Sequence, residues 1–100
     1  MNLRAVRVLR TEHSERHLIL EAKSEVAAVD LHYLSDGRVA GTVTVFEGQS
    51  INENNINLLL AFIDEDLLPE VSLKDDSLSF TVVIGKVLGN FLRDTDSPKV

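Results

Sequence analysis

The sequence predicts an α+β protein, in which an antiparallel sheet carries one main helix packed on one of its faces. Three observations support this fold class. Apolar and polar residues alternate over residues 3–47, the apolar spacing becomes helical over residues 50–68, and strand-like segments return over residues 71–84. The expected order of elements is therefore β-β-β-β-α-β-β, followed by a short C-terminal helical turn.

The composition is that of one ordinary globular domain. The chain has 100 residues, of which 44% are hydrophobic and 26% charged, and it contains no cysteine. We expect a single compact domain over residues 1–93 and a disordered tail over residues 94–100, because the tail lacks apolar periodicity. Without a signal peptide or an apolar run of roughly 18 residues, the expected location is the cytoplasm and no contact with a membrane is expected.

The first four strands are predicted from their alternating pattern and from the turn residues between them. The strand segments are residues 3–10, 17–23, 26–34 and 38–47. Between the last two, a three-residue loop with Gly37 in the left-handed conformation places apolar residues opposite apolar ones. The resulting pairs are Tyr33 with Val39, Val29 with Val43, Asp30 with Thr42 and Ala28 with Thr44.

The preceding hairpin is expected to turn tightly at Ser24 and Glu25. This register predicts a buried face that holds the cross-strand pairs Leu18 with Leu31, Leu20 with Val29 and Ala22 with Ala27. The opposite face is then polar, as in a sheet with one side in water, with Ile19 as its one apolar exception. The polar residues of that face are His17, Glu21, Asp30, His32, Thr42 and Thr44.

A capping box formed by Ser50 and Glu53 is expected to begin the helix. The helix should end by about Leu68, because Pro69 disfavours helical geometry at the residue before it. Its buried stripe is predicted to consist of Ile56, Leu59, Leu60, Ile63 and Leu67.

Two short elements are expected after the helix. Residues 71–73 and 78–84 are predicted to form a second hairpin, with Leu73 opposite Leu78 and Val71 opposite Phe80. Apolar residues between 87 and 92 then indicate a short helical turn, which Gly89 weakens.

The sequence lacks the usual signatures of catalysis, so no catalytic residue, cofactor or metal site is expected. It has no cysteine, no nucleophile-elbow motif and no glycine spacing of a phosphate-binding loop. An alternative hypothesis is a small metal- or ligand-binding enzyme on the polar face of the sheet. In the register above, His17 lies opposite His32 with Asp30 close by, and such a group can bind a divalent metal.

The acidic triplet Asp64, Glu65 and Asp66 has three interpretations. The helix can end near Ile63 with an aspartate capping a following turn, or the charges can simply be solvated at the end of the helix. In the third interpretation the triplet and Glu70 form an acidic surface for a basic protein. The net charge of −6 and the pI near 4.9 argue against a nucleic-acid binder, because such proteins usually have a basic face.

The helix also carries Leu58 and Phe62 away from its predicted buried stripe. Either the C-terminal segment around Phe91 covers them, or a second protein chain does, as in a homodimer. We therefore expect a non-enzymatic protein-interaction module, such as an inhibitor of a basic toxin or a chaperone. The predicted contact residues are Leu58, Phe62, Asp64, Glu65, Asp66 and Glu70.

Overall fold

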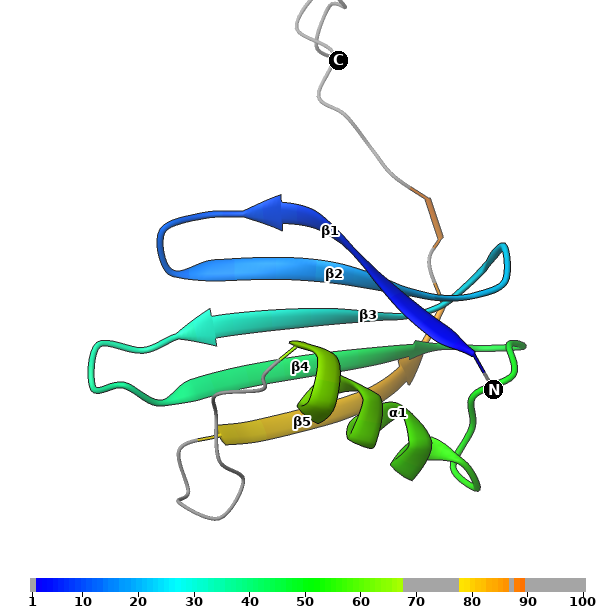
Figure 1. The fold of residues 1–100 in the computed structure, drawn as a ribbon. Coiled ribbons are helices and arrows are strands. Elements are labelled where there is room, and N and C mark those ends of the chain that lie inside the picture. Colours follow the sequence, from blue (N-terminus) through cyan, green and yellow to red (C-terminus); the bar gives the residue numbers. More distant parts are fainter. Residues whose placement is uncertain (1, 68–77, 87, 90–100) are drawn as a thin grey trace, which may run out of the picture.

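The computed structural model describes residues 2–67, 78–86 and 88–89, and they form one mixed sheet with one helical segment (Figure 1). The strands lie side by side in chain order. They are β1 (Leu3–Arg10), β2 (Ser14–Glu21), β3 (Ser24–Tyr33), β4 (Val39–Phe46) and β5 (Leu78–Gly85). Helix α1 (Ile56–Phe62) continues into a π-helical turn, η1 (Ile63–Leu67). No helix among these residues is both long and apolar enough to cross a bilayer.

The sheet is antiparallel from β1 to β4, but β5 pairs with β4 in parallel. The prediction of an entirely antiparallel sheet is therefore wrong at its last strand. The physical reason is the connection, because a chain that leaves β4, forms a helix and returns beside β4 makes a crossover, which joins parallel strands. Of the expected second hairpin, residues 78–84 do form a strand, whereas residues 71–73 lie outside the described part of the chain.

The hairpin between β3 and β4 has the predicted loop and register. Gly37 has a φ of 87°, and the Leu34 N–H donates to the Arg38 carbonyl at 2.8 Å to close the three-residue loop. Glycine reaches this left-handed conformation at no steric cost. The four predicted cross-strand pairs are all present, from Tyr33 with Val39 to Ala28 with Thr44.

The hairpin between β2 and β3 differs from the prediction. The turn occupies Ala22 and Lys23, with Ala22 in the left-handed region at a φ of 55°, so that Glu21 pairs with Ser24. A bulge between Ile19 and Leu20 shifts the register again.

The register of β2 decides which of its side chains are buried. Leu18 lies opposite Ala28 rather than Leu31, so the register is shifted by three residues. A shift by an odd number of residues turns every side chain of a strand to the other face of the sheet. Ile19, the predicted exception, is therefore completely buried, while Leu18 and Leu20 are only half-buried on the opposite face.

One apolar cluster joins the sheet and the helical segment. Figure 1 shows α1 lying in front of the sheet, and its Leu59 and the Ile63 of η1 are both fully buried within this cluster. The strands contribute residues including Ile19, Val29, Leu31, Val43 and Val45. The predicted stripe is confirmed at these two helical positions, and Ile56 and Leu67 pack against the same cluster.

The predicted capping box is not formed, because the helix begins later, at Ile56. Its N-cap, Asn55, instead stabilises the loop before it. The Asn55 Oδ1 accepts a hydrogen bond from the Asn52 N–H at 2.7 Å, and its Nδ2 donates to the Ser50 carbonyl at 2.8 Å. Asparagine side chains make such local backbone contacts readily, and this competes with helix formation over residues 50–54.

The expected C-terminal helical turn over residues 87–92 lies outside the described residues except for Leu88 and Gly89, and the tail over residues 94–100 lies wholly outside them. At those two described positions the backbone belongs to no helix or strand.

Candidate functional site

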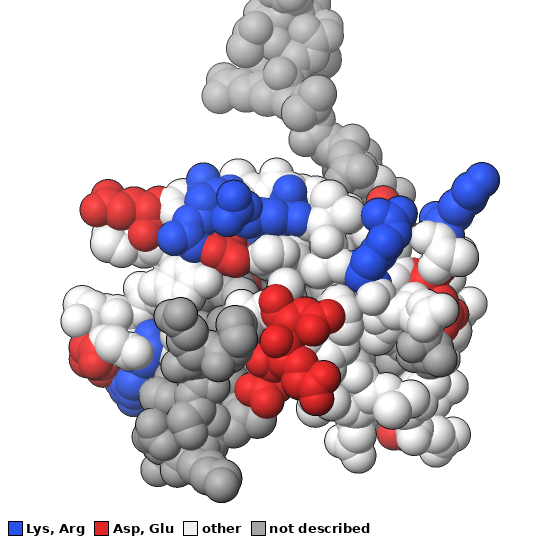
Figure 2. All heavy atoms as spheres, viewed as in Figure 1, with Lys and Arg blue, Asp and Glu red and all other residues white. Residues whose placement is uncertain are grey.

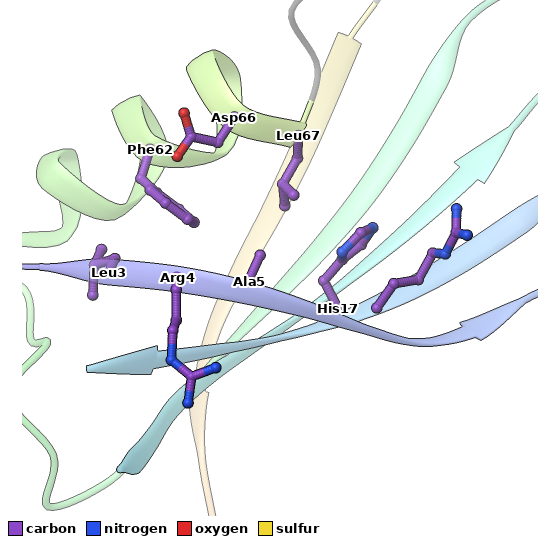
Figure 3. Close-up of a pocket in the computed structure, with 8 residues that line it drawn as sticks. Leu3, Arg4, Ala5, His17, Phe62, Asp66 and Leu67 are labelled. Carbon is purple, nitrogen blue, oxygen red and sulfur yellow. The ribbon is translucent and has the colours of Figure 1, made fainter. Parts of the chain in front are cut away.

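A cleft of about 490 Å³ lies between β1 and the end of the helical segment (Figure 3). Phe62 and Leu67 point into it from the helical side, and Leu3 and Ala5 of β1 form its apolar floor. The sheet alternates its side chains, so Arg4 extends to the far side of β1. The cleft is therefore lined by apolar side chains from both elements and also by the polar side chains of Arg7, His17 and Asp66.

Part of the Phe62 side chain is covered by another segment of the same chain, whereas the sequence alone left open what covers it. It is half-buried, packs against the hydrophobic cluster and faces β1 (Figure 3). The first strand provides this contact, and the segment around Phe91 lies outside the described residues, so its cover and that of a second chain stay predictions. Periodicity along the helix could not show it, because Leu3 and Ala5 lie far away in the sequence.

Leu58 remains 57% exposed, as predicted for a position off the buried stripe. It lines a second cleft, of about 350 Å³, together with Asn2, Leu3, Ala61, Phe62 and Glu65. The structure thus brings three of the predicted contact residues together, namely Leu58, Phe62 and Glu65.

The α-helix ends at Phe62 with Ile63 as its C-cap, and the acidic triplet lies on the π-helical turn η1 that follows. The turn that an aspartate was expected to cap extends to Leu68 and Pro69, which lie outside the described residues, so the capping interpretation stays a prediction. Glu65 and Asp66 are exposed, Asp64 is half-buried, and η1 has no basic residue in its last turn. Figure 2 shows acidic side chains gathered over the end of this segment, and basic side chains gathered over β1. Glu70, the sixth predicted contact residue, lies outside the described residues.

A polar network that the sequence did not predict lies at the edge of the inner face. The Nε2 of His17 lies 2.5 Å from the Oε1 of Glu15, and Glu15 also forms an ion pair with Arg10. The Arg10 guanidinium stands 5.2 Å from the centre of the Tyr33 ring. The signal that could have revealed this network was the apolar Ile19 on the supposed polar face, because correcting its face also turns His17 inward.

Burial and hydrogen bonding shift the acid–base properties of this network. Burial alone would raise the pKa of Glu15, but hydrogen bonds from His17 and Tyr33 and the positive charges of His17 and Arg10 together lower it. Burial raises the pKa of the Tyr33 hydroxyl, and the Glu15 carboxylate raises it further. The network therefore favours a charged Glu15 held among its donors.

The alternative metal site on the polar sheet face is not assembled. His17 lies opposite Val29 rather than His32, and its side chain is nine-tenths buried on the inner face. Asp30 is on the other face, where its carboxylate accepts hydrogen bonds from Arg16 at 2.6 and 3.2 Å. Within the described part of the chain, no three potential ligands lie close enough to hold a metal ion.

Replacing Glu15 by glutamine is expected to remove part of the pH dependence of stability. A carboxylate whose pKa is lowered by folding stabilises the protein above its unfolded pKa, near 4.5, and this contribution is lost as the pH falls through the lower folded pKa. The difference in unfolding free energy between wild type and Glu15→Gln should therefore be large at pH 7 and shrink in acid. Urea denaturation across this pH range measures it, with the exposed Glu25→Gln as a control. A difference that does not change with pH would contradict this assignment.

No protein-family model, curated protein or solved structure matches this chain, so its function has to be inferred from the geometry of these surfaces.

Proposed function

We propose that the chain is a non-enzymatic protein-binding module that recognises a basic partner protein through the outer side of its helical segment. The observation that carries this proposal is the exposed Leu58, which lines a cleft together with Phe62 and Glu65. Asp64 and Asp66 lie on the same π-helical turn as Glu65, and Asp66 lines the neighbouring cleft near β1. Glu70 completes the proposed contact set.

The proposed contact combines an apolar anchor with a charged rim. Binding energy at interfaces concentrates in a few well-packed side chains, and Leu58 and Phe62 offer such an apolar surface. The surrounding carboxylates would attract a positively charged protein to this surface and would repel acidic proteins. The best partner is therefore a protein that presents an apolar side chain beside lysine or arginine. An inhibited basic toxin and a chaperoned secreted protein both fit this description.

In this proposal the helix packs on one face of the sheet and so fixes the direction of the anchor. Leu59 and Ile63 are fully buried, and Leu58, next to Leu59 in the sequence, is turned outward. A surface held by the fold in this way loses less conformational entropy on binding than a flexible one.

An affinity purification from the native host, repeated at high salt, tests the proposal. We expect a basic partner that is released at high salt, because salt screens the contribution of exposed charges. Loss of a central anchor costs about 2 kcal/mol, so Leu58→Ala should weaken binding roughly thirty-fold. Glu65→Gln combined with Asp66→Asn should mainly slow association.

Leu34 provides a matched control, because this leucine is 41% exposed at the β3–β4 hairpin, away from the cleft. Leu34→Ala should bind the same partner as tightly as wild type. A partner that is acidic, or whose affinity is unchanged by Leu58→Ala and by salt, would contradict the proposal.

A further inference from the structure

The two edges of the sheet differ in how they are protected from pairing with another strand. β1, at one edge, carries Arg4, Arg7 and Arg10 and has a bulge between Arg7 and Leu9. Charges and bulges are the usual devices that keep an edge strand from pairing with another chain. β5, at the other edge, has no charged residue from Leu78 to Gly85 and a regular register with β4.

The backbone of β5 has hydrogen-bonding groups directed to the open edge. The Gly85 carbonyl accepts a hydrogen bond from the Glu47 N–H at 2.9 Å, so Gly85 faces the β4 side. Peptide groups alternate along a strand, and those of Phe80, Val82 and Ile84 therefore point away from β4. No other described strand pairs with this edge. An added strand would satisfy these donors and acceptors.

An apolar cleft of about 330 Å³ runs beside this edge, between β5 and α1. Val82 and Ile84 line it from the strand, and they are 39% and 50% exposed. Val45, Ile56 and Leu60 form its apolar wall, and Asn52 and Glu53 line it as well. Strand addition typically combines backbone pairing with a pocket for alternate side chains, and both features are present here.

We propose that β5 pairs antiparallel with β5 of a second copy of this chain, about a two-fold axis, to make one sheet continuous across both copies. Each chain has a net charge of −6, so two copies repel each other, and this repulsion is weakest where the contact holds few charged groups. Self-pairing of β1 would bring arginines near one another, and self-contact of η1 would bring carboxylates together. β5 is neutral, and symmetric dimers are the commonest oligomers.

The side chains of β5 allow this self-pairing in specific registers. Either Thr81 or Val82 can lie on the two-fold axis. In both registers Phe80 and Ile84 lie opposite residues whose side chains are on the same face of the sheet. The peptide groups that point away from β4 then face those of the other copy and can form hydrogen bonds with them. Aromatic and β-branched side chains then form cross-strand pairs, which are stabilising. Ile84 of one copy also comes close to the apolar cleft of the other.

Sedimentation equilibrium tests this proposal on the full chain. We expect the wild type to reach twice the chain mass of 11.1 kDa. Val82→Lys and Val82→Glu should each be monomeric, because like charges meet near the axis, and mixing the two variants should restore the dimer. Val6→Lys on β1 is the matched control, since Val6 and Val82 are both 39% exposed, and it should stay dimeric.

A single-cysteine variant gives a second measurement that does not depend on a charged substitution. The chain has no cysteine of its own, so Val82→Cys or Thr81→Cys, whichever residue lies on the axis, should form a disulfide-linked dimer on mild oxidation much faster than Val6→Cys. A monomeric or open-ended wild type, a dimeric Val82→Lys, or oxidation of both β5 cysteine variants no faster than that of Val6→Cys would overturn the proposal. The β5 edge does not include Leu58 or the acidic turn. If the dimer proposal fails, the proposed partner surface is therefore unaffected, and if the partner surface fails, the dimer proposal is unaffected.

Discussion

Leu59→Ala is expected to lower the free energy of unfolding by about 2–5 kcal/mol, whereas Leu58→Ala should lower it by about 0.5 kcal/mol or less. The two residues are the same type and adjacent, but Leu59 is fully buried and Leu58 is 57% exposed. Truncating Leu59 removes apolar contacts and leaves a cavity in the cluster shared with the sheet. Truncating Leu58 removes a side chain that already lies largely in water.

Urea denaturation followed by far-UV circular dichroism measures both values, since the chain has no tryptophan to report unfolding by fluorescence. Domains of this size are stable by only about 5–15 kcal/mol, so the loss at Leu59 is large enough to leave a partly unfolded population. Equal effects of the two substitutions would mean that Leu59 does not face the apolar cluster while Leu58 faces the solvent.

Ile19→Ala is expected to cost about 2–5 kcal/mol, and Leu18→Ala only about 1 kcal/mol. Ile19 is fully buried in the cluster, while Leu18 is half-buried on the face that carries Arg16 and Asp30. The comparison decides between the two registers of β2, because the register predicted from the sequence buries Leu18 and exposes Ile19.

The same denaturation experiment measures this second pair of variants. A larger loss at Leu18 than at Ile19 would restore the register in which Leu18 faces Leu31. A loss at Ile19 with little change at Leu18 supports the bulged register, in which His17 and Ile19 share the inner face.

The hairpins show which parts of the fold local sequence can predict. Gly37 identifies the β3–β4 loop because glycine tolerates the left-handed conformation, and one register then matches the apolar faces. The β2–β3 turn has no such signal, since its left-handed residue is Ala22, and non-glycine residues rarely adopt that conformation. The bulge after Ile19 adds a further register shift that simple alternation does not show.

The candidate site was predictable where it depends on the helix alone. The exposure of Leu58 and the burial of Leu59 and Ile63 follow from helical periodicity. The cover of Phe62 by β1 does not, because it depends on how distant segments are arranged. The parallel placement of β5 was missed for the same reason, although a helix between two strands is itself typical of a crossover.

The parallel pairing of β5 also has a consequence for the order of folding. The first four strands form a meander whose contacts are local, whereas β5 pairs Leu78 with the distant Val39. Contacts between residues far apart in sequence form slowly, because a long loop must be closed before any pairing compensates for the lost chain entropy. The meander can therefore form before the segment Leu78–Gly85, which is uncharged and rich in β-branched residues, pairs with β4. Until it docks, β5 is an unpaired apolar strand that can pair with other chains, so a high concentration of unfolded chains should disturb the pairing of β5 more than that of β1 to β4.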